Sequence, residues 1–329
     1  MFSGDSLRTI ALVRIGKIGD LIVTNFAIRK IRLAFPHAHI LLVTLPRNKE
    51  LLKYSKDVDE VVYFHKGVDL LRVLLRLRML RADLLIDFND NRSSTSAAIL
   101  RFGGASVKVG FVFDNKQWLT VPVNCPPKES VHISQRLRML PEAIGMTFDD
   151  SEIHPSLTLG VQELMEVKSN LQQVNAKNRN IIALNLSAGD SSRYWQTEKW
   201  HRLMREIQLR DPGAVFLLLH ASRDTALAKE VAEQQCPIVF PSHTSFQHFA
   251  AYISCASIQI SPDTSAIHIG CAFRIPLIGL YPAVEWNFQR WRPMGTLHET
   301  VRPKEGLVPD IQVDQVIEAY QNLRRRMLE

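Results

Sequence analysis

The chain has 329 residues, of which 46% are hydrophobic and 22% charged, and its formal net charge is +7. These values are typical of a soluble globular protein with room for two domains, and no apolar run reaches the roughly 18 to 20 residues that would span a membrane. The positive charge favours an anionic partner, whereas the low aromatic content (8%) and the lack of interleaved basic and aromatic residues argue against nucleic acid.

Strands and helices alternate along the first half of the chain. An apolar run over 9–13 predicts the first strand, and residues 24–35 carry apolar side chains at helical spacing. Residues 69–81 combine leucines with arginines and predict an amphipathic helix. Short apolar runs rich in branched residues predict further strands at 39–45, 60–65, 83–88 and 107–113.

The same alternation begins again in the second half. Residues 115–155 have no strong strand character, and 155–178 resemble a polar helix and linker. We therefore expect an α/β fold of two Rossmann-like, doubly wound domains facing a central cleft, with ligands at the carboxyl ends of the strands. The predicted strands are 180–189, 214–221, 237–242, 257–262 and 275–282, and the predicted helices are 197–210, 224–235, 245–256 and 265–273.

The four cysteines are widely spaced and include no C-x-x-C pair. Neither a zinc site nor a disulfide framework is predicted from this spacing. The N-terminal residues carry an acid early and only a short apolar run, so we expect no secretory signal. A location in the reducing cytoplasm is therefore predicted.

The sequence RIGKIGDLIVTN, residues 14–25, forms the expected turn from the first strand into the first helix. Gly16 and Gly19 allow a close approach of the backbone. Asp20 places a carboxylate at the helix start, where the helix dipole alone would stabilise it by about 0.3 to 1 kcal/mol. An acid at this position has two interpretations: a simple helix-start residue, or a group that takes part in chemistry.

A second notable stretch is SPDTSAIHIGCAFRIPLIGLYP, residues 261–282. A strand is expected to end at 262, and Asp263, Thr264 and Ser265 are all good helix-capping residues. The free amides and the dipole of the following helix would suit a pyrophosphate. His268 lies one helical turn after Thr264 and can face the same ligand, although a histidine among isoleucines is more often a core residue.

Three motifs together resemble glycosyltransferase family 9, which includes the ADP-heptose:lipopolysaccharide heptosyltransferases. They are the loop at 14–25, the segment SSRYWQTEKWHRL at 191–203 and the stretch that begins at Asp263. They occur in the order expected for this family, and the resemblance covers nearly the whole chain. It implies an inverting enzyme of the GT-B architecture, with two Rossmann-like domains.

The resemblance also implies roles for individual residues. Asp20 matches the catalytic base, and Arg14, Lys17 and Gly19 around it are expected at the acceptor. Asp224 is expected either to cap a helix or to bind the donor ribose. Trp195 and Trp200 are expected to pack in the core. Asp263, Thr264 and His268 match the donor-binding segment, and Arg193 stands where the family usually has a lysine near the donor phosphates. Ser265 and Ala266, which follow Thr264, are expected at the donor as well.

Three departures from the family pattern accompany these matches. Ser265 stands where the family has glycine, Ala266 stands where leucine is common, and VTNF replaces the usual Thr-x-Pro after the first loop. These departures bear on the donor details and on the choice of acceptor.

The domains take their expected roles from the same resemblance. Residues 1–160 would bind the acceptor, 175–310 would bind the nucleotide sugar, and the helix at 311–329 would return to the first domain. The implied reaction moves a heptose from ADP-heptose to the inner core of lipopolysaccharide, either lipid A-Kdo or a heptosylated core, with no metal or other cofactor. A nucleotide-sugar epimerase and a non-catalytic saccharide-binding relative are the alternatives.

The helix at 69–81 carries four arginines: Arg72, Arg76, Arg78 and Arg81. Such a helix either lies on an anionic membrane surface or packs on the core with a solvated basic face. Peripheral contact with the cytoplasmic face of the inner membrane is the expectation that follows from the first interpretation.

Overall fold

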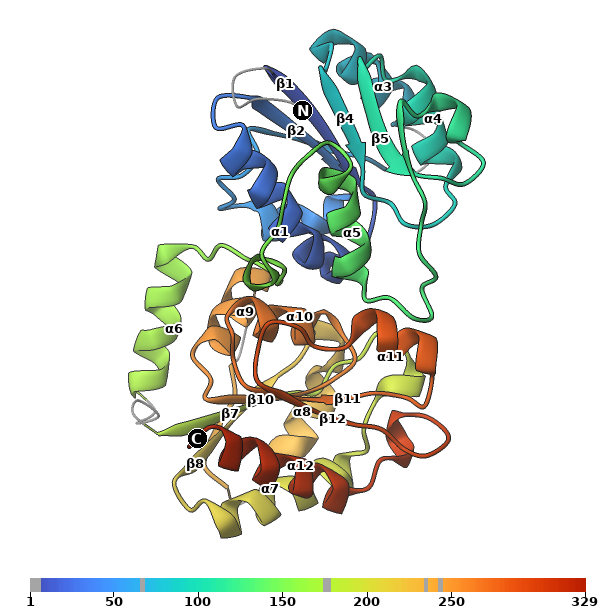
Figure 1. Cartoon of the computed structure of the whole chain (residues 1–329). Coiled ribbons are helices and arrows are strands. Elements are labelled where there is room, and N and C mark those ends of the chain that lie inside the picture. Colours follow the sequence, from blue (N-terminus) through green and yellow to red (C-terminus); the bar gives the residue numbers. More distant parts are fainter. Residues whose placement is uncertain (1–6, 66–68, 174–178, 234–235, 242–244) are drawn as a thin grey trace. The chain divides into compact units, whose positions relative to one another are not determined.

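The computed structural model describes residues 7–65, 69–173, 179–233, 236–241 and 245–329. The chain divides into two compact units, Met1–Thr158 and Leu159–Glu329. Each unit is a six-stranded sheet flanked by helices (Figure 1), and all the strand pairings are parallel. The α/β fold of two doubly wound units predicted from the sequence is therefore confirmed. No helix in the described ranges has the length and apolar character needed to cross a membrane.

The first sheet has the strand order β3-β2-β1-β4-β5-β6. The central strand, β1, is covered on both faces, and Ile10, Leu12 and Val13 have no exposed surface, as expected for a parallel strand between two helical layers. The strands are β1 (Thr9–Arg14), β2 (His39–Thr44), β3 (Glu60–Tyr63), β4 (Leu84–Asp87), β5 (Val107–Phe111) and β6 (Val121–Val123). The helices are α1 (Ile18–Ala34), η1 (Pro46–Asn48), α2 (Lys49–Leu52), α3 (Leu70–Leu80), α4 (Ser94–Phe102), η2 (Lys116–Trp118), α5 (Ile133–Glu142) and η3 (Asp150–Glu152).

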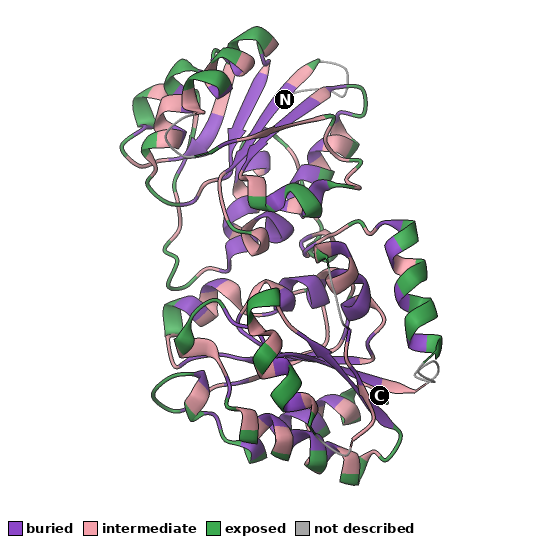
Figure 2. Ribbon diagram, turned by 180° about the vertical axis from the view of Figure 1, so that it is seen from behind, coloured by how far each residue is buried: buried purple, intermediate pink, exposed green. Residues whose placement is uncertain are grey.

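The second sheet has the strand order β12-β11-β10-β7-β8-β9. Its four inner strands are largely buried, and the exposed residues gather on the outer faces of the helices (Figure 2). The strands are β7 (Asn180–Asn185), β8 (Ala214–Leu219), β9 (Ile238–Val239), β10 (Ile258–Pro262), β11 (Leu277–Leu280) and β12 (His298–Val301). The helices are α6 (Val161–Gln173), η4 (Ser191–Arg193), α7 (Thr197–Arg210), η5 (Ser222–Asp224), α8 (Thr225–Ala232), α9 (Phe246–Ser254), α10 (Ser265–Ala272), α11 (Glu285–Trp291), η6 (Val308–Asp310) and α12 (Val313–Arg326).

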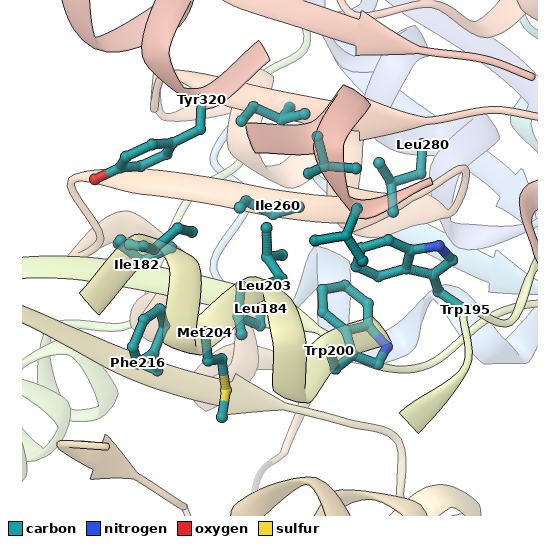
Figure 3. Close-up of a cluster of buried hydrophobic side chains, with 14 of the residues drawn as sticks. Ile182, Leu184, Trp195, Trp200, Leu203, Met204, Phe216, Ile260, Leu280 and Tyr320 are labelled. Carbon is teal, nitrogen blue, oxygen red and sulfur yellow. The ribbon is translucent and has the colours of Figure 1, made fainter. Parts of the chain in front are cut away.

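The two tryptophans of the 191–203 motif lie in the core of the second unit. Trp195 and Trp200 are 1% and 0% exposed and pack edge to face with ring centroids 4.8 Å apart (Figure 3). The Trp195 Nε1 donates to the Ile311 carbonyl at 3.1 Å, just before α12 begins. The predicted packing role of both residues is confirmed.

Helix α12 belongs to the second unit. Its apolar side chains, Val316, Tyr320 and Leu323 among them, are buried in the same core cluster as the two tryptophans. It packs against α7, β11 and β12. The apolar face of this helix is thus covered by its own unit, and the expected return of residues 311–329 to the first domain stays a prediction.

Two parts of the fold differ from the sequence prediction. The stretch 115–155 contains the short edge strand β6 and the helix α5, which the weak apolar pattern did not reveal. Strand β12 was also not predicted, because its residues, HETV, are polar at most positions and only Val301 is fully buried. Both missed strands lie at an edge of their sheet, where strand residues need little apolar character.

Candidate functional site

Asp20 lies on the first turn of α1, directly after β1. Its Oδ2 accepts a hydrogen bond from the Lys17 backbone N–H at 2.6 Å, so the helix-start interpretation is realised. The side chain is nevertheless 22% exposed. A Cβ atom at Gly16 would lie 2.7 Å from the Asp20 Cβ, so the glycine makes room for this acid. Gly19, the second residue of the helix, is partly exposed.

Arg14 lies behind Asp20 and is only 2% exposed. Its Nη2 lies 3.3 Å from the Asp20 Oδ1, and its Nη1 donates to the Asp90 Oδ1 at 3.1 Å and to the Phe88 carbonyl at 2.6 Å. This position corrects the prediction that Arg14 binds acidic groups on an acceptor, because the guanidinium is buried and already committed to the protein. Lys17, by contrast, is exposed at the same loop.

A second buried arginine completes the cluster. Arg136, from α5, donates through Nη1 to the Asp90 Oδ2 at 2.9 Å and through Nη2 to the Cys125 Sγ at 2.6 Å. The side chains of Arg136 and Asp90 are 4% and 1% exposed. Asp90 therefore joins two arginines, and one of these contacts Asp20. Neither Asp90 nor Arg136 was predicted, because no motif marks either residue and they lie 46 positions apart.

The carboxyl end of β4 adds another buried acid, Asp87. Burial raises its pKa from 3.8 to about 6, against the opposing effect of hydrogen bonds from Asn89 and of the charge of Arg14. Asn89 donates to Asp87 at 2.6 Å and accepts the Ile15 N–H at 2.9 Å. The loop after β4 is thereby tied to the loop that carries Asp20.

In the second unit, Asp263 follows β10 and is 5% exposed. Its Oδ2 lies 3.2 Å from the Arg193 Nη1 and accepts a hydrogen bond from the Asn287 Nδ2 at 2.6 Å. Burial raises the pKa of Asp263, while the Arg193 charge and the Asn287 hydrogen bond act in the opposite direction. The structure thus brings two of the predicted donor-site residues, Arg193 and Asp263, into contact.

Thr264 caps α10, as the sequence predicted. Its Oγ1 accepts the Ala266 N–H at 3.2 Å and also accepts a hydrogen bond from the Asn185 Nδ2 at 3.1 Å. Asn185, at the end of β7, donates to the Ser261 Oγ at 3.0 Å as well. Ser265, partly exposed, is the first residue of the helix. Asn185 was not predicted as a site residue, because a single asparagine after a strand carries no motif.

His268 is buried among the residues of α10, and its ring centroid lies 5.7 Å from that of Trp291. Burial lowers its pKa from 6.5 to about 4, so the imidazole is neutral near pH 7. Position 270, two residues further on, requires glycine because a Cβ there would lie 2.0 Å from the Gln259 Oε1. The close approach at this glycine is made by the protein's own sheet.

Asp224 makes no capping hydrogen bond to α8. Its Oδ1 instead accepts from the Tyr194 hydroxyl at 2.9 Å, and its Oδ2 lies 3.6 Å from the Arg223 Nε. Of its two expected roles, the side-chain helix cap is therefore not realised. Among the described residues, no group of three or more His, Cys, Asp and Glu side chains is arranged to hold a metal ion.

Comparison with known proteins assigns the family. The model of glycosyltransferase family 9 (heptosyltransferase) matches residues 70–321. The chain belongs to this family. It is 23% identical to lipopolysaccharide heptosyltransferase 3 of Escherichia coli strain K12 over 93% of this chain and 95% of the relative.

Solved structures agree on the fold. A glycosyltransferase family 9 structure from Veillonella parvula has a TM-score of 0.82 at 15% identity, with 96% of this chain and 97% of that chain covered. The E. coli ADP-heptose lipopolysaccharide heptosyltransferase II has a TM-score of 0.76 at 18% identity, with coverage of 98% and 100%. This family 9 member thus has the two-domain GT-B fold and is a glycosyltransferase, which decides against the epimerase alternative.

Asp90→Ala tests the buried cluster. Removing this acid leaves Arg14 and Arg136 without their shared counter-ion in the core, which should lower the free energy of unfolding by about 3 to 5 kcal/mol. Urea unfolding of the full chain measures the change. The control is Asp114→Ala, which breaks the exposed pair with Arg92 (side chains 79% and 76% exposed) and should have little effect. Equal effects of the two variants would contradict a special role for the buried pair.

Asp87→Asn tests the raised pKa of this buried acid. Because that pKa is about 6 in the folded unit and 3.8 ordinarily, the folded state binds the proton more tightly, and this stabilisation is lost as pH rises through about 6. The stability of Asp87→Asn relative to the native chain should therefore rise by about 1 kcal/mol between pH 5 and pH 7. Urea unfolding at both pH values measures it, and a difference independent of pH would show that Asp87 does not titrate in this range.

Proposed function

We propose that this family 9 glycosyltransferase moves a heptose from ADP-heptose to the inner core of lipopolysaccharide, with inversion at the anomeric carbon. The family description supports heptose transfer, and the name of the E. coli lipopolysaccharide heptosyltransferase 3 supports the acceptor. The E. coli ADP-heptose lipopolysaccharide heptosyltransferase II, which shares the fold, is named for both substrates. The mechanism rests on the surroundings of Asp20. Its carboxylate is partly exposed and is oriented by a buried arginine at the carboxyl end of the central strand.

Asp20 acts in this proposal as the general base. Its carboxylate accepts the proton of an acceptor hydroxyl while the hydroxyl oxygen attacks the anomeric carbon from the face opposite the diphosphate. The bond between that carbon and the diphosphate oxygen breaks, and its electron pair leaves with ADP. Proton transfer of this kind contributes about 10² to 10⁴ to the rate. Because Lys17 and Arg14 hold the two carboxylate oxygens, the direction of the remaining lone pairs is fixed.

The second unit supplies the donor site. The Arg193 guanidinium, 30% exposed, and the amide end of α10 at Ser265 and Ala266 would stabilise the charge that grows on the leaving diphosphate. This electrostatic arrangement requires no metal ion. We assign Asp263 to the positioning of Arg193, because its carboxylate is buried and occupied by the protein.

The other predicted donor contacts stay in the proposal with adjusted roles. Thr264 orders the start of α10, and His268 would meet the ligand as a neutral imidazole. Asp224, held by Tyr194, would accept a hydrogen bond from a ribose hydroxyl.

The acceptor is proposed to bind at the first unit. Lys17 is exposed beside Asp20, and Gly19 keeps the helix start accessible, so this loop would meet the sugar and its anionic groups. Arg14 contributes indirectly, by holding Asp20. Lipid A-Kdo and a heptosylated core are the two acceptors proposed, and the enzyme would work as a peripheral protein at the cytoplasmic face of the inner membrane.

Incubation of the full chain with ADP-heptose and a deeply truncated lipopolysaccharide tests the reaction. Mass spectrometry should show the glycolipid heavier by one heptose and an equivalent amount of ADP released. Release of ADP without a heavier glycolipid would mean donor hydrolysis, and an intact donor after hours would mean a saccharide-binding protein. Either result would overturn the proposed transfer.

Asp20→Asn tests the base. The amide keeps the shape of the side chain but cannot take the proton, so turnover should fall by about 10² to 10⁴ while the Kd for ADP changes by no more than about twofold. Steady-state kinetics and calorimetry give the two readouts, and urea unfolding checks that the variant is folded. Turnover close to that of the native chain would remove Asp20 from the mechanism.

A further inference from the structure

Helix α3 carries an apolar ridge on its outer side. Leu71, Leu75 and Met79 follow one another at intervals of four residues and are 68%, 51% and 77% exposed. The face that packs on the core is different: Val73 and Leu77 are 0% and 1% exposed, and Leu70, Leu74 and Leu80 pack partly buried against the same cluster. The helix therefore has more apolar side chains than its contact with the core requires. The outer side of the helix therefore carries exposed apolar side chains as well as exposed arginines.

A further exposed aromatic side chain lies at the end of the neighbouring helix, α4. Phe102, the last residue of α4, is 39% exposed, and its carbonyl accepts a hydrogen bond from the Arg78 Nε at 2.9 Å (Figure 1 shows the two helices side by side). The large hydrophobic side chains that are exposed on the described part of the first unit are Leu33, Leu71, Leu75, Met79 and Phe102. All of these except Leu33 lie on α3 or at the end of α4, two helices that pack against each other. Such a concentration marks an interaction surface, because exposed apolar side chains are normally scattered.

Arginines border the ridge on both sides. Arg72 and Arg78 on α3 and Arg101 on α4 are exposed, and the Arg101 guanidinium lies 4.8 Å from the centre of the Phe102 ring. The Arg72 Nη2 donates to the Tyr63 carbonyl and lies 3.3 Å from the Asp69 Oδ2, and the Arg78 Nε donates to the Phe102 carbonyl, so these contacts fix both side chains at the border. A guanidinium has five N–H donors, and the others can bind phosphate groups.

We propose that this ridge, formed by Leu71, Leu75, Met79 and Phe102 with its arginine border, inserts into the surface of an anionic phospholipid bilayer. The apolar side chains would enter the boundary between head groups and acyl chains, while the arginines bind lipid phosphates above them. A second copy of the chain fits less well, because a two-fold contact through this ridge would bring the arginines of both copies together.

This inference deepens the proposed peripheral location and names the surface responsible. It rests on the proposed function only in that a lipopolysaccharide acceptor would explain why the enzyme binds a membrane. Vesicle binding needs neither donor nor acceptor, so its failure and the failure of heptose transfer are separate results.

Co-sedimentation of the full chain with vesicles tests the ridge. Vesicles of phosphatidylcholine with one quarter phosphatidylglycerol should bind the native chain at least about tenfold more strongly than pure phosphatidylcholine at low salt. At 1 M salt, where the screening length falls to about 3 Å, that preference should largely disappear. The triple variant Leu71→Gln, Leu75→Gln, Met79→Gln should lose about tenfold or more of its binding to the anionic vesicles.

The control is the double variant Leu33→Gln, Leu209→Gln, which changes two leucines of similar exposure, 66% and 77%, outside the ridge. It should bind vesicles as the native chain does, and both variants should keep native helical content and native affinity for ADP. Equal binding by the triple variant and the native chain would overturn the proposal. So would a concentration-dependent dimer of the native chain in sedimentation velocity that the triple variant fails to form, because the ridge would then be a protein interface.

Discussion

The buried ion pair between Arg14 and Asp90 is the interaction on which the first unit depends. It lies at the carboxyl end of the central strand, with side chains 3% and 1% exposed. A charge in that position is costly unless its partners are complete. Arg136 satisfies the other oxygen of Asp90, and Asp20 takes the other end of Arg14. The same contacts therefore stabilise this end of the sheet and orient the candidate base.

The second unit also pairs an aspartate with an arginine, but the buried and exposed members are exchanged. There the acid, Asp263, is buried with its side chain 6% exposed, and the arginine, Arg193, is 30% exposed. In the first unit the exposures are 3% for Arg14 and 22% for Asp20. Each unit thus buries one member of an Asp-Arg pair to hold the other at the surface. The side chain held at the surface is the acid in the first unit and the arginine in the second.

The sequence alone predicted those parts of the fold that depend on short stretches of neighbouring residues. Apolar runs located the central strands, and the capping pattern located Thr264 at the start of α10. It was insufficient where the information lies in contacts between distant residues. Arg136 meets Asp90 across 46 positions, and Asn185 meets Thr264 across 79. The outward side of α3 was also hidden, because helical spacing assigns leucines to a face but does not say which face meets the sheet.

Gly16 gives the loop at β1 a property that a list of site residues would miss. A Cβ there would lie 2.7 Å from the Asp20 Cβ, so a side chain at 16 and the acid at 20 compete for the same volume. A substitution of this glycine would displace the carboxylate while leaving it in the sequence. A mutational survey that scores one position at a time would record two independent requirements, a glycine at 16 and an acid at 20. The molecule has a single requirement, which is an acid with empty space beside it.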